Sequence, residues 1–534
     1  MSKMTGGQAL MRSLYLEGVR VIFGLPGVQL YYAMDALYEQ SEIRFIATRH
    51  EQATTYMADG FSRAGGGIGV ALMVPGPGLL NASSGIATAY SASSPIMVVC
   101  GQIEQESIGL DRGMLHEVND QIDTIRPRTK SARRLLDPAA IPEAVHESFR
   151  DLKTGRPRPV EIEIPPETLA QVSDVDLLEP GDHRRPAARA ESIQQAAREL
   201  AQAERPLIWA GGGVISSEAT ESLTRLAEYL QAPVIATAEG RGAVSDKHPL
   251  SLGGMRLRND PIAKEDPNFD LILSVGSRMV NAFWLGGQRV IQIDIDADEA
   301  GRNYENTLPL VGDARGTLEG LLAAVSAQTP AHPSREVEVA ALRERRSQTA
   351  RRVEPQDSYI AAIRAAIPDD GLLISGMTQL GYYSRAFYPV YHPRSFFTSS
   401  YSGNLGYAFP VALGVKVAQP DKPVVALSGD GGFLFNSQEL ATAVQYGINV
   451  VVVLFNDNAY GNVLRDQVNR FEGRAIGAEL HNPDFMKLAE AYGARGLRAE
   501  GPEQLEAKLR EALSYNAPTI VEVPVGMLPS PFEG

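Results

Sequence analysis

The sequence predicts an α/β protein of three domains, each a doubly wound parallel sheet covered by helices. Short runs of β-branched residues alternate with helical stretches along the whole chain, which is typical of parallel sheets. The length of 534 residues corresponds to about three domains of ordinary size. A segment rich in proline and charge at 178–190 and a charged segment at 329–356 divide the chain into three blocks.

Each block supplies its own strands. We expect strands at 19–23, 43–47, 68–73, 96–99 and 160–164 in the first block, at 206–210, 233–237, 271–275 and 290–295 in the second, and at 372–375, 423–427, 450–455 and 519–523 in the third. The corresponding domains are placed at residues 1–176, 190–328 and 357–534. No repeat of fixed period is visible, but the first and third domains are expected to be built alike.

The composition excludes several classes of function. Acidic residues outnumber basic ones, 64 to 50, and the resulting net charge of −14 disfavours nucleic acids and anionic membranes as partners. Because Cys100 is the single cysteine, disulfides within the chain and cysteine-based metal clusters are excluded. Cys100 lies in an expected buried strand. No apolar run approaches the ~18 residues of a membrane span, and the first residues lack an apolar leader. We therefore expect a cytoplasmic protein.

Two acidic loops follow neighbouring strands of the third block. Asp430 lies in a glycine-rich turn, 429–432, directly after one expected strand, and Asp457 follows the next strand along the chain. Ligands of open parallel sheets bind at the carboxyl ends of the strands. Glycines there allow backbone N–H groups to approach an anion, and carboxylate oxygens hold Mg²⁺ against a diphosphate. The residues alone leave open whether this is a metal–diphosphate site or a pair of polar turns.

The GDG turn, followed some two dozen residues later by an Asn-Asn-like pair, resembles the cofactor motif of the thiamine diphosphate-dependent enzymes, in particular the large catalytic subunit of acetolactate synthases. The resemblance implies Mg²⁺ ligands at Asp430, Asp457 and the carbonyl oxygen of Ala459. The family carries Asn where Asp457 stands, and the added negative charge is expected to tighten metal binding. The resemblance also implies that Leu405 is a wedge that bends the cofactor and that the Gly403 carbonyl accepts a hydrogen bond from its pyrimidine amino group. Further cofactor contacts implied in this domain are Gly376, Met377, Thr378, Gly429, Gly431, Gly432, Tyr460 and Gly461.

The first block carries an independent match. The segment Arg49–Ala53 (RHEQA), with the ADG of 58–60 after it, resembles the family segment that bears the activating glutamate, here Glu51. Such a carboxyl exchanges a proton with the cofactor's pyrimidine ring, and an apolar setting would keep it protonated near neutral pH. The alternative interpretation is that Glu51 only complements the helix dipole. The turn from Pro75 to Asn81 resembles the family turn that lines the pyrimidine. The resemblance thus makes the first domain pyrimidine-binding and the third diphosphate- and Mg²⁺-binding.

Three residues of the first domain are candidates for substrate contact. They are Leu25, His116, which stands where acetolactate synthases carry a glutamine, and Gln121. No two of the eight histidines are adjacent, whereas simple pyruvate decarboxylases carry a His-His pair. The segment after Tyr460 lacks the tryptophan that selects acceptors in true acetolactate synthases.

The central domain resembles that of acetolactate synthases, which holds FAD in some members. Its glycine triplet, 211–213, follows a strand but lacks the GxGxxG order of dinucleotide sites. The loop Gly253–Arg258 replaces the family's histidine-bearing glycine loop, so FAD is disfavoured without being excluded. A calcium-like acidic run at 294–305 is rejected because Glu299 occupies the position that requires glycine.

The expected function is a thiamine diphosphate- and Mg²⁺-dependent enzyme that decarboxylates a 2-keto acid, or a related small carbonyl substrate, and ligates the product to an acceptor. Two alternatives stay open. One is a decarboxylase, C–C lyase or hydrolase of the same superfamily without ligation, and the other is a non-catalytic nucleotide-binding protein. The resemblance also implies a homodimer or homotetramer in which the first domain of one subunit meets the third domain of another at the active site.

Overall fold

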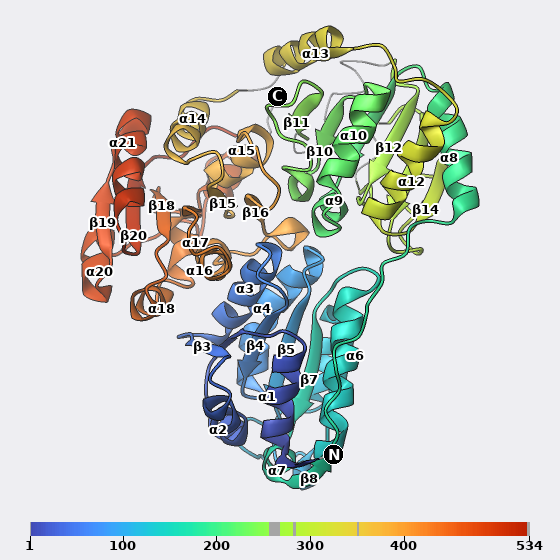
Figure 1. Ribbon diagram of the computed structural model, residues 1–534. Helices are drawn as coiled ribbons and strands as arrows, with labels where there is room; N and C mark the ends of the chain where they lie inside the picture. The colour runs from blue at the N-terminus through green and yellow to red at the C-terminus, as the bar shows by residue number, and fades with distance from the viewer. Residues whose placement is uncertain (1, 256–267, 281–284, 350–351, 531–534) are drawn as a thin grey trace.

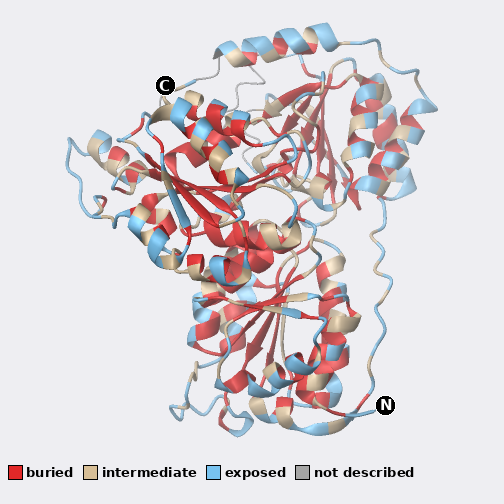
Figure 2. Cartoon of the chain, turned by 60° about the vertical axis from the view of Figure 1, so that its left-hand side comes forward, coloured by how far each residue is buried: buried red, intermediate tan, exposed pale blue. Residues whose placement is uncertain are grey.

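The computed structural model describes residues 2–255, 268–280, 285–349 and 352–530, and its three domains meet around a common junction (Figure 1). The first domain lies below in this view, and the third and central domains lie above it. Each domain contains one six-stranded sheet in which all neighbouring strands are parallel. Figure 2 shows these sheets as buried layers between helices. The doubly wound α/β class expected from the sequence is confirmed.

The first domain wraps helices around both faces of the sheet β3-β2-β4-β5-β7-β6. Helices α1, α2 and α6 cover one face, and α3 and α4 cover the other. A separate antiparallel pair joins β1 to β8. The strands are β1 (Ser2–Thr5), β2 (Val21–Gly24), β3 (Arg44–Ala47), β4 (Gly69–Met73), β5 (Ile96–Gly101), β6 (Ser131–Arg134), β7 (Val160–Ile164) and β8 (Val172–Val175). The helices are α1 (Gly6–Leu16), α2 (Tyr31–Glu39), α3 (Glu51–Arg63), α4 (Pro77–Ser91), α5 (Gln121–Ile125), α6 (Ile141–Lys153) and α7 (Pro166–Ala170).

The third domain repeats this topology. Its sheet has the order β16-β15-β17-β18-β20-β19, and in both domains the strands, numbered within the domain, run 2-1-3-4-6-5. The two domains are therefore built alike, as expected. The strands are β15 (Leu372–Ser375), β16 (Phe396–Thr398), β17 (Val424–Gly429), β18 (Val451–Asn456), β19 (Arg495–Arg498) and β20 (Thr519–Pro524). The helices are α14 (Gln356–Ala366), α15 (Gln379–Phe387), α16 (Ala408–Ala418), α17 (Asp430–Leu434), α18 (Glu439–Tyr446), α19 (Gly461–Arg470), α20 (Phe485–Tyr492) and α21 (Gly501–Ser514).

The central domain has a different strand order, β11-β10-β9-β12-β13-β14, which is 3-2-1-4-5-6 within the domain. Dinucleotide-binding folds use this order. The strands are β9 (Pro206–Ala210), β10 (Val234–Ala236), β11 (Ser251–Gly254), β12 (Leu271–Val275), β13 (Arg289–Asp294) and β14 (Thr307–Val311). The helices are α8 (Ala190–Gln202), α9 (Gly212–Ser216), α10 (Thr220–Leu230) and α12 (Ala314–Ser326), followed by the connecting helix α13 (Glu336–Thr349). Within the described ranges, no helix is both long and apolar enough to cross a membrane.

Every strand expected from the sequence is present, with its ends within one or two residues of the expected positions. The strands that were not expected are β1, β6, β8, β11, β14, β16 and β19. Of these, β6, β11, β14, β16 and β19 lie at sheet edges. Strands β6, β14 and β19 are partly exposed and lack the continuous apolar runs of central strands, whereas β11 and β16 are buried but only four and three residues long.

The first and third domains share one apolar core where α3 packs on α16. Two glycines permit the crossing. A β-carbon on Gly60 would lie 2.2 Å from the carbonyl oxygen of Val411, and one on Gly414 would lie 2.0 Å from that of Met57. Any side chain at these positions would separate the helices, so the crossing fixes how the two domains face each other.

Gly414→Ala is expected to loosen this crossing and to destabilise the chain by about 1–3 kcal/mol, the usual effect of overpacking a core. The measurement is the midpoint of thermal unfolding, which should fall by several degrees. Gly526→Ala is the matched control, because a β-carbon on Gly526 meets no atom within 4 Å. Equal midpoints for the two variants would contradict the role of the crossing.

Candidate functional site

Three neighbouring strands of the third domain, β15, β17 and β18, end at one edge of the sheet, and a helix begins after each. These helices are α15, α17 and α19, with Thr378, Gly429 and Tyr460 as their N-terminal cap residues. Helix N-termini present free N–H groups and the positive end of the helix dipole. Their convergence suits an anion with several oxygens, such as a diphosphate.

The two acids expected as metal ligands lie together at this edge. Asp430 is almost fully buried, and Asp457 is partly buried. Burial and the neighbouring charge of Asp430 raise the pKa of Asp457 above its usual range. Two carboxylates that repel each other at a buried edge fit a site for a divalent cation, whose charge reverses that repulsion. Among the described residues, no three histidine, cysteine, aspartate or glutamate side chains gather as a metal centre. Further ligands would therefore be oxygens such as the Ala459 carbonyl and those of the diphosphate.

Glycines make room for the acidic loop. A β-carbon on Gly461 would lie 2.0 Å from Asp457 Oδ2, and one on Gly431 would lie 2.6 Å from the ring of Tyr460. Tyr460 thus packs directly over the turn that carries Asp430. The residue types at these positions follow from this close packing and need no bound ligand to explain them.

The loop that resembles the cofactor wedge lies beside this edge. Gly403 has φ of +65°, which favours glycine, and Leu405 is half-buried. The Leu405 Cδ2 atom would lie 3.9 Å from a β-carbon on Gly432, and Met377 Cε would lie 3.6 Å from one on Gly403. The structure therefore brings together three of the four segments expected at the cofactor in this domain, 376–378, 403–405 and 429–432. The fourth, 457–461, contacts the last of these through Tyr460.

Three polar residues that the sequence reading missed hold the two acids in place. Gln379 donates from Nε2 to Asp457 Oδ2 (2.7 Å), and its Oε1 accepts from Arg465 Nη1 (3.0 Å). Asn482 donates from Nδ2 to Asp430 Oδ2 (2.6 Å). Gln379 stands next to Thr378 at the start of α15, a position that could have drawn attention to it. The sequence offers no comparable signal for Arg465 or Asn482.

In the first domain, Glu51 and Asn81 lie in contact at the start of two helices. Glu51 is the first residue of α3, and Asn81 lies in the first turns of α4. Asn81 Nδ2 donates a 3.0 Å hydrogen bond to Glu51 Oε2. Pro75 and Gly76, at φ of +56°, form the turn into α4. The structure thus brings together the pyrimidine-side candidates Glu51, Pro75 and Asn81.

A further acid, Glu439 at the start of α18, ties the third domain to the turn before Glu51. Both Glu439 carboxylate oxygens accept from the Arg49 N–H (3.0 and 3.2 Å), and Oε2 accepts from Thr442 Oγ1 (2.6 Å). Burial raises the pKa of Glu439 to about 7. From the sequence, a glutamate in the first turn of a helix is indistinguishable from a complement to the helix dipole.

Two of the three substrate candidates, His116 and Gln121, lie against the turn of Gly76. The Gly76 N–H donates to Gln121 Oε1 (2.8 Å), and a β-carbon on Gly76 would lie 2.2 Å from the carbonyl oxygen of His116. His116, at φ of +70°, has Nδ1 3.1 Å from Gln29 Oε1. Gln121 is 2% exposed, and its Nε2 donates to Glu163. Leu25 follows β2, beside the end of β4. Contact of Leu25, His116 or Gln121 with substrate stays a prediction.

A cavity of about 670 Å³, called here the central cavity, lies at the point where the strand order of the central domain reverses, between β9 and β12, and residues of the first and third domains complete its lining. The glycine triplet lines it, but close packing explains two of these glycines: β-carbons on Gly211 and Gly213 would collide with Gly276. Arg156, from the first domain, also lines this cavity and donates to Asp294 Oδ1 (2.6 Å) and Asp296 Oδ2 (3.1 Å). Arg256, Leu257 and Arg258, on which the expectation about FAD partly rests, lie outside the described residues.

Comparisons with known proteins match all three domains. Residues 4–124, 193–321 and 376–523 match the N-terminal TPP binding, central and C-terminal TPP binding domains of thiamine pyrophosphate enzymes. A probable acetolactate synthase large subunit from Methanocaldococcus jannaschii is 35% identical over 97% of this chain and 92% of its own length. A probable 2-ketoarginine decarboxylase, AruI, from Pseudomonas aeruginosa is 35% identical over 97% and 94%. The acetolactate synthase isozyme 3 large subunit of Escherichia coli is 32% identical over 96% and 93%.

Replacing Glu439 by glutamine should make stability less dependent on pH. Between about pH 4.5 and 7 the folded chain keeps a proton on Glu439 that the unfolded chain has lost, so the stability from this group falls as pH rises through that window. We expect the thermal midpoint of Glu439→Gln, relative to the parent, to rise between about pH 5 and 8, by the equivalent of ~3 kcal/mol at most. Glu503→Gln, at an exposed glutamate of α21, is the control. A parallel pH profile for parent and Glu439→Gln would contradict the prediction.

Proposed function

The chain belongs to the thiamine pyrophosphate enzyme family and is an enzyme of the acetolactate synthase type, and from that premise we propose that it uses Mg²⁺ with thiamine diphosphate to decarboxylate a 2-keto acid and to join the product to a carbonyl acceptor. The observation that carries the proposal is the meeting of Asp430, Asp457 and three helix N-termini at one sheet edge. Basic side chains are not needed to hold a diphosphate there, because backbone N–H groups and the cation attract its negative charge.

Each cluster has its own part in the proposed reaction. Asp430, Asp457 and the Ala459 carbonyl would hold Mg²⁺, with Gln379 fixing the Asp457 carboxylate. Glu51, held by Asn81, would exchange a proton with the pyrimidine ring. When bound, the cofactor supplies a carbon nucleophile and an electron sink for cleavage next to a carbonyl. Leu405 would support its bent shape, and the turn at Gly76 would close the substrate side.

We also propose that a second subunit completes each active site, in a homodimer or homotetramer. Large apolar side chains are exposed beside both clusters. In the first domain these are Leu80 (45%), next to Asn81, and Leu115 (62%), next to His116. In the third domain they are Phe435 (47%), just after α17, and Val463 (50%), in α19. Apolar surface at the rim of a polar site is typical of an interaction surface.

The acceptor step separates the proposed reaction from its alternative. The relative named a 2-ketoarginine decarboxylase is as similar to this chain as the relative named an acetolactate synthase large subunit. A non-ligating decarboxylase, C–C lyase or hydrolase is therefore the alternative, acting on a small carbonyl or 2-keto acid. His116, in the place of a family glutamine, is the residue we propose to test for substrate choice.

FAD is not part of the proposed catalytic machinery. In folds with the strand order of the central domain, an acidic residue after the second strand binds a nucleotide ribose. The corresponding Glu239, which follows β10, is engaged by Arg63 (2.7 Å) and by the Thr398 hydroxyl. The alternative from another class of function is a non-catalytic nucleotide-binding protein. FAD or ADP in the purified protein would show that the central cavity is occupied. The cytoplasmic location stays a prediction.

Two variants test the cofactor assignments. Asp430→Ala should abolish retention of thiamine diphosphate and Mg²⁺ through desalting, because it removes a metal ligand. Glu51→Gln should retain both but lose turnover by about 10²–10⁴-fold, the usual range for a proton-transfer group. Cofactor is measured by mass spectrometry and metal analysis. Retention of cofactor by Asp430→Ala, or full activity of Glu51→Gln, would refute the corresponding role.

Product analysis tests the reaction itself. The protein, loaded with thiamine diphosphate and Mg²⁺, is incubated with a panel of 2-keto acids, with and without an aldehyde or second keto acid as acceptor. Carbon dioxide with a ligated hydroxyketone is the expected outcome. Carbon dioxide with a free aldehyde, whatever acceptor is present, would favour the non-ligating alternative. Absence of both, in a protein that holds cofactor, would overturn decarboxylation.

A further inference from the structure

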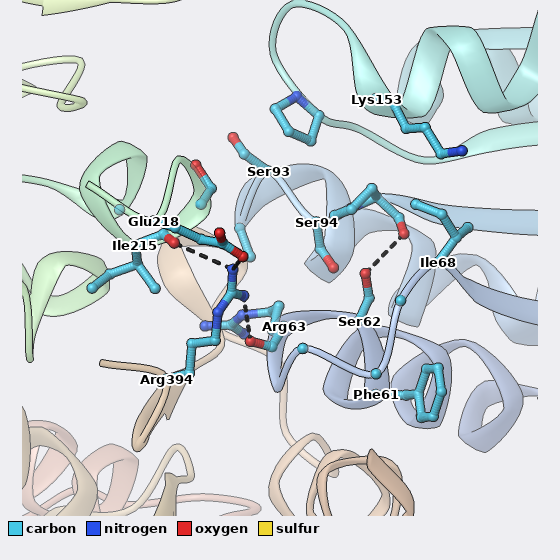
Figure 3. Close-up of a pocket in the computed structure, with 18 of the residues that line it drawn as sticks. Phe61, Ser62, Arg63, Ile68, Ser93, Ser94, Lys153, Ile215, Glu218 and Arg394 are labelled. Carbon is cyan, nitrogen blue, oxygen red and sulfur yellow. Dashed lines mark hydrogen bonds and ion pairs between the residues drawn. The ribbon is translucent and has the colours of Figure 1, made fainter. Parts of the chain in front are cut away.

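A cavity of about 410 Å³ lies where all three domains meet, within the usual size range of small-molecule sites (Figure 3). The first domain contributes the end of α3 and the loop 65–68, the central domain contributes α9, and the third domain contributes the segment 394–397. None of the residues expected at the cofactor or substrate lines it. The proposed function therefore leaves this cavity without a role.

The lining is basic although the chain as a whole is acidic. Its basic side chains outnumber its acidic ones by two to one. Two of the acids are engaged by basic partners: Glu239 pairs with Arg63 at 2.7 Å, and Glu17 pairs with Lys153 at 3.2 Å. A concave surface with an excess of one charge attracts ligands of the opposite charge.

Two guanidinium groups carry most of this excess. Arg394 donates to the carbonyl oxygens of Arg63 (3.0 Å) and Ile215 (3.3 Å), and Arg185 donates to those of Lys153 (2.8 Å) and Ser216 (3.2 Å). The nearest carboxylate to Arg394 is the exposed Glu218, 4.0 Å away. Burial lowers the pKa of Arg394; the charge of Glu218 opposes this lowering, and the like charge of Arg185 adds to it. An anion in the cavity would relieve this imbalance.

The backbone of Arg394 is also unusual. Its φ of +57° lies in the left-handed region that bulky residues rarely adopt. This conformation directs the side chain from the third domain into the junction, between the ends of α3 and α9, as Figure 3 shows. Strain of this kind persists where surrounding contacts hold it, and it is concentrated at ligand-binding positions.

Apolar side chains complete the lining. Phe61, Ile68 and Ile215 border the cavity, as do Phe396 and Phe397. A β-carbon on Gly67, in the loop before β4, would meet no atom within 4 Å, so this side of the cavity is open. The lining thus combines a cationic group with an apolar wall.

We propose that this three-domain cavity binds a small organic anion that carries one carboxylate or phosphate group on an apolar body. The charged group binds between Arg394 and Arg185, and the body packs on the apolar wall. An occupant contacts the end of α3, which begins at Glu51, and β16, which leads into the loop of Leu405. Binding at this cavity does not depend on the proposed reaction.

Ser93 allows a matched test. It is half-buried on the cavity wall and also borders the central cavity, and its φ of +54° is one that aspartate and asparagine adopt readily. Ser93→Asp adds a negative charge, and Ser93→Asn adds the same shape without charge. Arg394→Gln removes a cation that lines the three-domain cavity and does not line the central cavity. Thermal unfolding shows whether each variant is folded.

Binding of phenylphosphate, phenylacetate and the neutral benzyl alcohol is measured by calorimetry on the full chain loaded with thiamine diphosphate and Mg²⁺. The parent and Ser93→Asn should bind at least one of the two anions equally well, and benzyl alcohol should not bind. Ser93→Asp and Arg394→Gln should bind that anion about tenfold more weakly or worse. The anion that binds identifies the preferred charged group.

Three outcomes would overturn the proposal. The first is that the parent binds neither anion in the millimolar range. The second is that Ser93→Asp binds the anion like the parent, which places binding elsewhere. The third is that Arg394→Gln binds the anion as tightly as the parent and Ser93→Asp binds it more weakly, which places the anion in the central cavity. Cofactor loading and product formation are measured separately, so failure here is distinguishable from failure of the proposed function.

Discussion

The crossing of α3 on α16 is the constraint on which the rest of the chain depends. The two groups of cofactor candidates lie in different domains: Glu51 begins α3, and the loop of Leu405 directly precedes α16. Gly60 and Gly414 bring the backbones of these helices together, and one apolar core then runs through both domains. Because an interior packed this closely deforms little, the spacing of the crossing also sets the positions of both helix starts.

Charge acts locally in this protein. The net charge of −14 disfavours polyanionic partners as a class, but it says nothing about individual sites. At the carboxyl edge of the third sheet, three helix N-termini create an environment that suits an anion through backbone N–H groups. At the three-domain junction, Arg185 of the segment 178–190 and Arg394 of the third domain create another. The two environments differ in origin, because one is built from backbone dipoles and the other from side chains.

Much of the candidate site is held by polar residues that no motif identifies. Gln379 reaches Asp457 across 78 positions of sequence, and Glu439 reaches Arg49 across 390. Each makes its bond only because two strands or two domains are placed together. A buried carboxyl that holds a turn and an exposed glutamate that complements a helix dipole look the same in a sequence.

The sequence by itself determined the α/β class and the central strands, and it predicted the residues of the candidate site that belong to motifs. Central strands such as β17 and β18 are continuous apolar runs, and the glycine and acidic turns after them form a local pattern. Tertiary structure alone decided edge strands such as β6 and β19, which are at most half-buried and carry no such run. It also decided the shared topology of the first and third domains, the crossing at Gly60 and Gly414, and the basic cavity between domains. The pattern of neighbouring residues determines which side chains of a segment are buried. These features depend instead on which distant segment packs against them.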